Sequence, residues 1–138
     1  MSNTLTVARG AEGTQTMAVH FRIEDPSGNG NELMPADMIV DPAPSGFPQV
    51  ALGSGSSVPL TFANPQPSTG SRNIRISLVQ TDDLGGTLED KALVTFTISA
   101  EGAIDTSSFQ EYLSDASQIV VDGTTINVPS NFLDGFSS

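Results

Sequence analysis

Four acidic residues near the middle of the chain are the side chains best suited to metal chemistry. Asp82, Asp83, Glu89 and Asp90 lie close together around a Gly-Gly pair. Hard cations such as Ca²⁺ prefer several carboxylate ligands, so the cluster is a candidate calcium site. Its spacing matches no calcium-binding loop, however, and acidic turns are common. We therefore predict that the chain holds neither a metal nor any other cofactor.

Catalytic chemistry has little support among the remaining residues. His20 is the only histidine, and the chain has no cysteine. An imidazole base would need a nucleophile or an acid within hydrogen-bond reach, and the sequence offers no such pairing. The serines lack the G-x-S-x-G motif of a nucleophile elbow. The alternative is that His20 is an ordinary strand residue, and we predict no enzyme activity.

Alternating residues predict the strands that would position these groups. Residues 58–63, 72–80 and 91–99 alternate between two faces. In the clearest of them, Ile74 and Ile76 fall on one side of the strand and polar residues on the other. One face is therefore expected to cover a core, while the other is available to a partner.

A different periodicity follows the last of these strands. Asp105 or Thr106 can cap a helix, and Ser107 with Gln110 three residues later fits a helix capping box. The apolar residues that recur at helical spacing predict a helix with one buried stripe. They are Phe109, Tyr112, Leu113, Ala116 and Val120.

Together these patterns predict a single domain with an α+β fold over residues 1–138. A chain of 138 residues is long enough to bury a core without disulfides. The expected order is an N-terminal β-hairpin at 1–25, an antiparallel sheet of about five strands at 46–99, a helix at 105–122 and a tail at 123–138.

The charge distribution bears on possible partners. A net charge of −11 disfavours nucleic acid, because affinity for phosphates comes mostly from Lys and Arg. No acidic residue lies between Pro42 and Thr81, however, and this window contains Arg72 and Arg75. The predicted sheet is therefore neutral to weakly basic. The alternative explanation is that strands generally disfavour Asp and Glu.

Membrane association is not expected from the sequence. The first residues lack the basic flank and apolar stretch of a signal peptide. No apolar run is long enough to cross a bilayer. We therefore expect a protein that works without a membrane.

Three segments resemble the coat proteins of the small single-stranded RNA bacteriophages, the leviviruses. They are the strand ending Phe62-Ala63-Asn64-Pro65, the strand led by Arg72 after a short polar turn, and the run Ala92-Leu93-Val94-Thr95-Phe96 before the predicted helix. The resemblance implies a homodimer clasped by its helices. Such dimers would assemble into an icosahedral shell that encloses genomic RNA, a virion built in the cytoplasm of a bacterial host.

The resemblance also implies roles for individual residues, with no small-molecule substrate. The residues facing RNA would be Thr61, Arg72, Asn73, Arg75, Ser77, Lys91, Thr95 and Thr97. The dimer interface would consist of Phe109, Tyr112, Leu113, Ala116 and Val120. The loop between dimers would contain Asp82, Asp83, Gly85, Gly86 and Glu89.

Two alternatives stay open at this point. The RNA-facing residues could equally be polar side chains on the open face of an antiparallel sheet, with no ligand. The chain could also be a β-rich adhesion or accessory domain, such as a tail or surface subunit of a larger phage, that does not bind RNA. Self-assembly into shells would distinguish the coat protein from the accessory domain.

Overall fold

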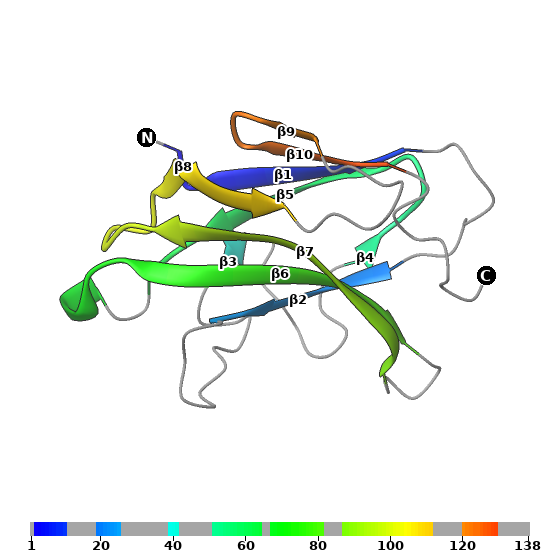
Figure 1. Ribbon diagram of the computed structural model, residues 1–138, viewed down its shortest axis with the longest axis horizontal. Helices are drawn as coiled ribbons and strands as arrows, with labels where there is room; N and C mark the ends of the chain where they lie inside the picture. The colour runs from blue at the N-terminus through cyan, green and yellow to red at the C-terminus, as the bar shows by residue number, and fades with distance from the viewer. Residues whose placement is uncertain are drawn as a thin grey trace.

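The computed structural model describes residues 2–10, 19–25, 39–41, 51–64, 67–81, 87–111 and 120–129. Most of this part is strand (Figure 1). The strands are β1 (Thr4–Arg9), β2 (Val19–Glu24), β3 (Ile39–Asp41), β4 (Ala51–Leu52), β5 (Ser57–Phe62), β6 (Arg72–Thr81), β7 (Thr87–Ile98), β8 (Ile104–Glu111), β9 (Val120–Asp122) and β10 (Thr125–Val128), and one 3₁₀ turn, η1, covers Pro67–Thr69.

The strands form two five-stranded sheets. Sheet A has the order β3-β5-β1-β10-β9, and sheet B has the order β4-β2-β6-β7-β8. The pairing of β1 with β10 is parallel, and the other pairings between described strands are antiparallel. One hydrophobic cluster contains residues of both sheets, so the two pack face to face as a β-sandwich.

Alternation within the strands builds this core. Leu5 and Val7 of β1 point inward from sheet A, and Ile74 and Ile76 of β6 point inward from sheet B. All four are fully buried. Burial of apolar surface contributes about 25 cal/mol per Å² removed from water, which makes this shared cluster the main stabilising element.

An aromatic pair connects the two sheets within the core. Phe62 of β5 and Phe96 of β7 meet edge to face, with ring centroids 5.4 Å apart. Phe109 of β8 extends the group, since its ring centroid lies 5.2 Å from that of Phe96. Edge-to-face contacts of this kind contribute about 0.5–1.5 kcal/mol beyond the burial of area.

Arg9 is a polar exception in the inward row of β1. It continues the buried series of Leu5 and Val7 and is only 3% exposed. Its guanidinium Nη1 donates a 2.8 Å hydrogen bond to the carbonyl oxygen of Leu52 in β4. Burial lowers the pKa of Arg9 from its ordinary value. The side chain therefore links an inner strand of sheet A to an edge strand of sheet B.

The helix predicted at 105–122 is wrong. Residues Ile104–Glu111 form β8 and Val120–Asp122 form β9, so both described parts of that range are extended. The expected α+β fold is therefore replaced by a two-sheet, nearly all-β structure. Tyr112, Leu113 and Ala116 of the predicted dimer interface lie outside the described residues.

The residues that suggested a helix cap form a local turn instead. Asp105 Oδ1 accepts hydrogen bonds from the Ser107 amide (3.0 Å) and the Ser107 hydroxyl (2.6 Å). A short polar side chain that binds the backbone two residues later is compatible with an Asx turn as well as with a helix cap. The neighbouring Thr106 and Ser108 are weak helix formers, which favours the extended alternative.

The N-terminal hairpin predicted at 1–25 is also absent. Strands occupy both expected positions, but β1 pairs with β5 and β10 in sheet A, whereas β2 pairs with β4 and β6 in sheet B. Between Gly10 and Val19 the chain crosses from one sheet to the other. A period of two identifies a strand without identifying its neighbour, and this explains the error.

The sheet predicted at 46–99 is divided in the same way. The strands expected at 58–63, 72–80 and 91–99 exist as β5, β6 and β7. However, β5 belongs to sheet A, while β6 and β7 belong to sheet B. In the predicted tail, Thr125–Val128 form β10 beside β1.

The acidic loop is shorter than the sequence suggested. Strand β6 continues to Thr81 and β7 begins at Thr87. Glu89 and Asp90 therefore lie within a strand. The inter-dimer loop residues Asp82, Asp83, Gly85 and Gly86 lie outside the described residues.

Candidate functional site

Half of the predicted RNA-facing residues do share one face. Asn73 lies opposite Thr97, and Arg75 lies opposite Thr95, across the β6–β7 pair. Directly opposed residues of an antiparallel pair project from the same side of a sheet. The Thr97 hydroxyl donates a 3.2 Å hydrogen bond to Asn73 Oδ1. These four residues lie on the face of sheet B that points away from the core.

Two further residues of the predicted set are not available on that face. Ser77 projects from the same side of β6, where it lies opposite Arg22, but it is only 1% exposed. Thr61 belongs to β5 of the other sheet, and its hydroxyl lies 3.0 Å from that of Thr4. Neither residue can contact a ligand bound over Arg75.

The last two predicted residues belong to the opposite side of sheet B. Arg72 is paired with Ile98, and Lys91 is paired with Leu78. Both apolar partners are fully buried in the core. An irregularity in register after Ile76 shifts the alternation, which is why Lys91 does not share a face with Arg75. The predicted basic surface is therefore split between two sides of one sheet.

The arginines of sheet B bind carboxylates of the same fold. Arg75 Nη2 lies 2.7 Å from Glu24 Oε1, and this glutamate side chain is 3% exposed. Arg72 Nη2 lies 3.0 Å from Asp25 Oδ2. Glu24 and Asp25 follow one another in the chain, so β2 and its end neutralise two arginines of the neighbouring β6.

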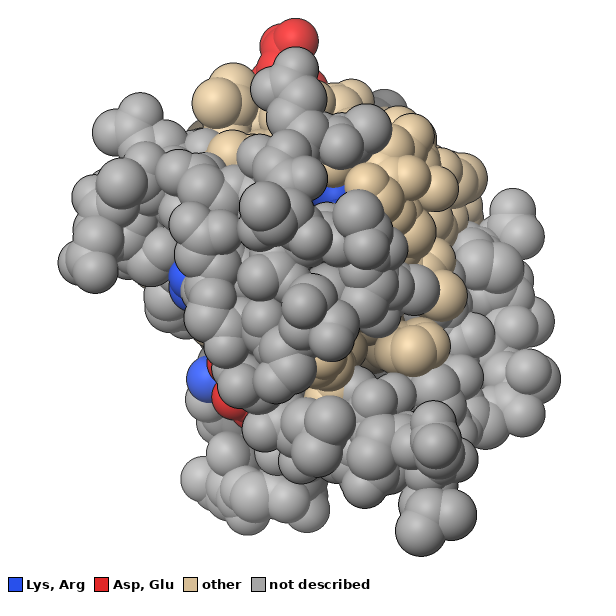
Figure 2. Space-filling view, turned by 90° about the vertical axis from the view of Figure 1, so that its right-hand side faces the viewer, with Lys and Arg blue, Asp and Glu red and all other residues tan. Residues whose placement is uncertain are grey.

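The remaining basic residues are also engaged. Arg22 Nη2 lies 2.7 Å from Asp90 Oδ2, Arg9 is inside the sandwich, and Lys91 is not free either. Together with Arg72 and Arg75 these are the five Lys and Arg residues of the chain. On the face shown in Figure 2 the described surface is mostly uncharged, and one blue area lies directly beside a red one.

The acidic cluster does not form a metal site among the described residues. Asp90, the one member whose side chain is described, binds Arg22. No group of three or more His, Asp or Glu residues within the described ranges could hold a metal ion. The calcium site considered from the sequence thus gains no support.

His20 has no catalytic partner in the part of the chain that the structure describes. Its Nδ1 is buried and makes no hydrogen bond there. Burial lowers the pKa of His20 below its ordinary value of 6.5, because the charged imidazolium is poorly solvated. The ring is therefore neutral at neutral pH, as expected of a strand residue.

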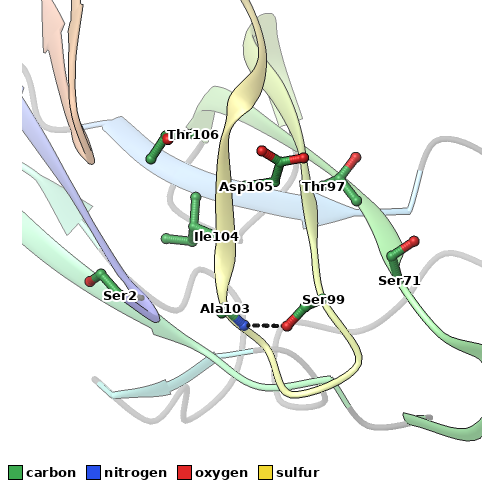
Figure 3. A pocket seen from close by; sticks show the side chains of 8 residues that line it. All are labelled: Ser2, Ser71, Thr97, Ser99, Ala103, Ile104, Asp105 and Thr106. Atoms are coloured by element: carbon green, nitrogen blue, oxygen red, sulfur yellow. Dashed lines mark hydrogen bonds between the residues drawn. The ribbon is translucent and has the colours of Figure 1, made fainter.

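A hollow of about 400 Å³ at one end of sheet B is the best candidate for a binding site (Figure 3). It surrounds the turn between β7 and β8. Most of its lining side chains carry a hydroxyl group, and one carries a carboxylate. We call it the hydroxyl pocket, and it is lined by Ser2, Ser71, Thr97, Ser99, Ala103, Ile104, Asp105 and Thr106.

The β7–β8 turn is held by Ser99. The Ser99 hydroxyl oxygen accepts hydrogen bonds from the amides of Glu101 (3.2 Å) and Ala103 (3.1 Å). Gly102 has a φ of +85°, and a Cβ there would lie 3.1 Å from backbone atoms of Phe62 and Ala63. Only glycine combines that conformation with so close an approach. The turn therefore fixes one wall of the pocket.

Strand β8 then bulges away from β7. Thr97 lies opposite Asp105, whereas Thr95 lies opposite Gln110, so β8 has extra residues between the two positions. The Ser108 hydroxyl bridges this gap. It accepts a 2.8 Å hydrogen bond from the Thr97 amide and donates a 2.6 Å hydrogen bond to the Asp105 carbonyl oxygen.

The bulge leaves the side chains of Asp105 and Thr97 next to each other. Figure 3 shows their polar ends turned in the same direction, with Ser71 of the neighbouring chain segment beyond Thr97. Hydrogen bonds from the Ser107 hydroxyl and then the Ser107 amide lower the pKa of Asp105. The carboxylate is consequently ionised at neutral pH and acts as an acceptor.

Sequence reasoning missed this pocket. The sequence suggests Asp105 or Thr106 only as a helix cap, and it assigns no role to Ser71 or Ser99. The Asp-x-Ser spacing at 105–107 was a usable signal, because it is typical of Asx turns. The lining residues come from β7, from β8 and the turn between them, and from the positions just before β1 and β6, and they could not be grouped without the sheet order.

Comparisons with protein-family models, curated proteins and solved structures return no match. Within the described residues, no helix has the length and apolar character needed to span a bilayer.

Proposed function

We propose that this chain is a non-catalytic β-sandwich domain of the adhesion or accessory class, which works by binding a partner and does not enclose RNA. One observation carries the proposal. The five basic side chains are engaged within the fold, and Arg72, Arg75 and Arg22 are paired with carboxylates. The described surface therefore presents no cationic face.

Electrostatics support the absence of RNA binding. A protein gains affinity for RNA by neutralising phosphates with Lys and Arg. Here a phosphate near Arg75 would have to displace Glu24, which is almost fully buried and would keep only the longer, 3.6 Å contact with Arg22 Nε. Weakening the pairing of a buried charge is costly, and this cost opposes the binding of a phosphate at the surface.

The coat-protein function suggested by the family resemblance stays a prediction. Its dimer depended on a clasping helix, and the described parts of that segment are strands. Phe109, one of the predicted interface residues, packs against Phe96 of its own chain. A coat built on this sandwich would therefore need a different interface, and the accessory class is the better supported of the two.

The chemistry of the hydroxyl pocket favours binding over catalysis. General acid and base catalysis requires groups with pKa values near the working pH. The only carboxylate of the lining is Asp105, whose pKa is lowered, and the lining contains no histidine or lysine. Hydroxyl groups with one carboxylate can form a hydrogen-bonding site.

Titration of a labelled single-stranded RNA with the purified full chain tests the proposal. Fluorescence anisotropy should detect no binding tighter than about 10⁻⁴ M, even at low salt. The proposal would be contradicted by tighter binding that weakens as salt is raised. The same titration with Arg75→Ala would then show whether the face of sheet B is responsible.

A further inference from the structure

We propose that the hydroxyl pocket binds a neutral sugar ring. The inference rests on the proposed binding function and names its ligand class. A sugar presents hydroxyl groups that both donate and accept hydrogen bonds. The pocket offers a mixed set of donors and acceptors, held on a constrained turn.

The hydrogen bonds already made determine what three of these groups can offer. The Ser99 hydroxyl oxygen accepts two amide hydrogen bonds, so its proton is available to a ligand. The Thr97 hydroxyl donates to Asn73, so its oxygen is available as an acceptor. Asp105 uses Oδ1 for Ser107, which leaves Oδ2 to accept from a ligand.

Two further hydroxyl groups make no hydrogen bond within the described residues. Ser71 and Thr106 are exposed, and either can donate or accept. Ala103 and Ile104 are buried and add apolar surface to the lining. A sugar ring suits this combination, because its hydroxyl groups surround a framework of C–H groups.

Charge excludes the main competing ligand classes. An anion such as phosphate would face the ionised Asp105 without any basic group in the lining. A divalent cation would find one carboxylate where Ca²⁺ prefers several among six to eight oxygen ligands. An organic amine would pair with Asp105 but leave most of the hydroxyl groups unused. A neutral polyol can hydrogen-bond both to Asp105 and to the hydroxyl groups beside it.

The test is a titration of the ¹⁵N-labelled full chain with a panel of methyl glycosides of glucose, galactose, mannose, fucose and N-acetylglucosamine, followed by NMR. At least one glycoside should shift the amides of Thr97, Ser99 and Ala103–Thr106, with a Kd in the millimolar range. Shifts confined to other parts of the chain, or none with any glycoside at concentrations up to about 100 mM, would overturn the inference.

Matched variants locate the binding. Asp105→Ala should weaken the glycoside about tenfold, because it removes a charged acceptor. Thr97→Val should also weaken it while keeping the shape of the side chain. Asp122→Ala removes an exposed carboxylate from β9 of the other sheet and should leave the Kd unchanged. Equal affinity in all three variants would refute the assignment of the pocket.

The two proposals fail in different ways. If the protein binds RNA in the anisotropy titration, the function proposed above fails, while the glycoside titration still decides the sugar site. If the protein ignores RNA but no glycoside shifts the pocket amides, only the sugar site is refuted.

Discussion

Arg9 illustrates how one residue can join two sheets. It takes the place of an apolar side chain in the inward row of β1, and its guanidinium reaches the carbonyl oxygen of Leu52 in β4. Strand β4 has two residues and lies at the edge of sheet B, where it pairs with β2 and buries Leu52 in the core. The buried cation thus stabilises an edge that alternation alone would leave weakly attached.

Replacement of Arg9 should therefore affect global stability. We expect Arg9→Ala to lower the free energy of unfolding by about 2–3 kcal/mol, since it removes a charged hydrogen bond and leaves a buried carbonyl oxygen without its donor. Arg9→Lys keeps the charge and one donor and should cost less. Urea denaturation measures both. An Arg9→Ala variant as stable as the wild type would contradict the role in joining the sheets.

The pKa of His20 makes stability depend on pH. Because burial lowers this pKa below 6.5, the unfolded chain takes up the proton before the folded protein does. Stability is therefore full above pH 6.5 and falls as the pH drops through the range between the unfolded and folded pKa values. We expect His20→Gln to reduce the loss of melting temperature between about pH 7.5 and 5.5. An identical loss in wild type and variant would contradict this expectation.

At the scale of elements, the β7–β8 turn decides the geometry of the hydroxyl pocket. Gly102 combines a positive φ with a close approach to the chain after β5. The hydrogen bonds of Ser99 then close the turn, and the Ser108 bridge supports the bulge that follows. The pocket is therefore built from turn chemistry, with little contribution from the regular part of the sheet.

Two glycines allow a matched test of this turn. Gly102 and Gly70 both have positive φ, but a Cβ at Gly70 would meet no atom of the described residues within 4 Å. Gly70→Ala should cost about 1 kcal/mol of unfolding free energy for backbone strain alone. Gly102→Ala should cost about 1–3 kcal/mol more because of steric overlap with backbone atoms. Equal losses of unfolding free energy in the two variants, measured by urea denaturation, would show that the close approach at Gly102 does not affect stability.

The elements also show what could be predicted from the sequence. Strands β5, β6 and β7 were identified because a period of two marks a half-buried strand. Their distribution between two sheets could not be seen, since either sheet gives the same pattern. Strand β8 was mistaken for a helix, because Phe109 and the cap-like Ser107 fit helical spacing over a short range.

Long-range pairing accounts for the rest of the difference. Strand β1, near the start of the described chain, pairs in parallel with β10, near its end. The residues of neither strand indicate this pairing. Of the candidate RNA-facing residues, alternation within β6 and β7 correctly grouped Asn73, Arg75, Thr95 and Thr97. It could not reveal the carboxylates of Glu24 and Asp25 that pair with the arginines.

At the scale of the whole molecule, the charge pattern separates the two functions considered. The net charge is −11, and the five Lys and Arg side chains interact with other groups of the same chain. Like charges oppose close packing of many copies, and RNA would add further negative charge. A binding domain tolerates such a surface, whereas a shell filled with RNA requires cations on its inner side.

The measurement that tests this account most directly is size-exclusion chromatography of the recombinant chain with light scattering and absorbance at 260 and 280 nm. The chain has one Tyr and no Trp, so packaged RNA would dominate the absorbance. We predict a small, RNA-free species at both physiological and high salt. Large, uniform particles with strong absorbance at 260 nm would contradict the accessory-domain function and favour the coat protein.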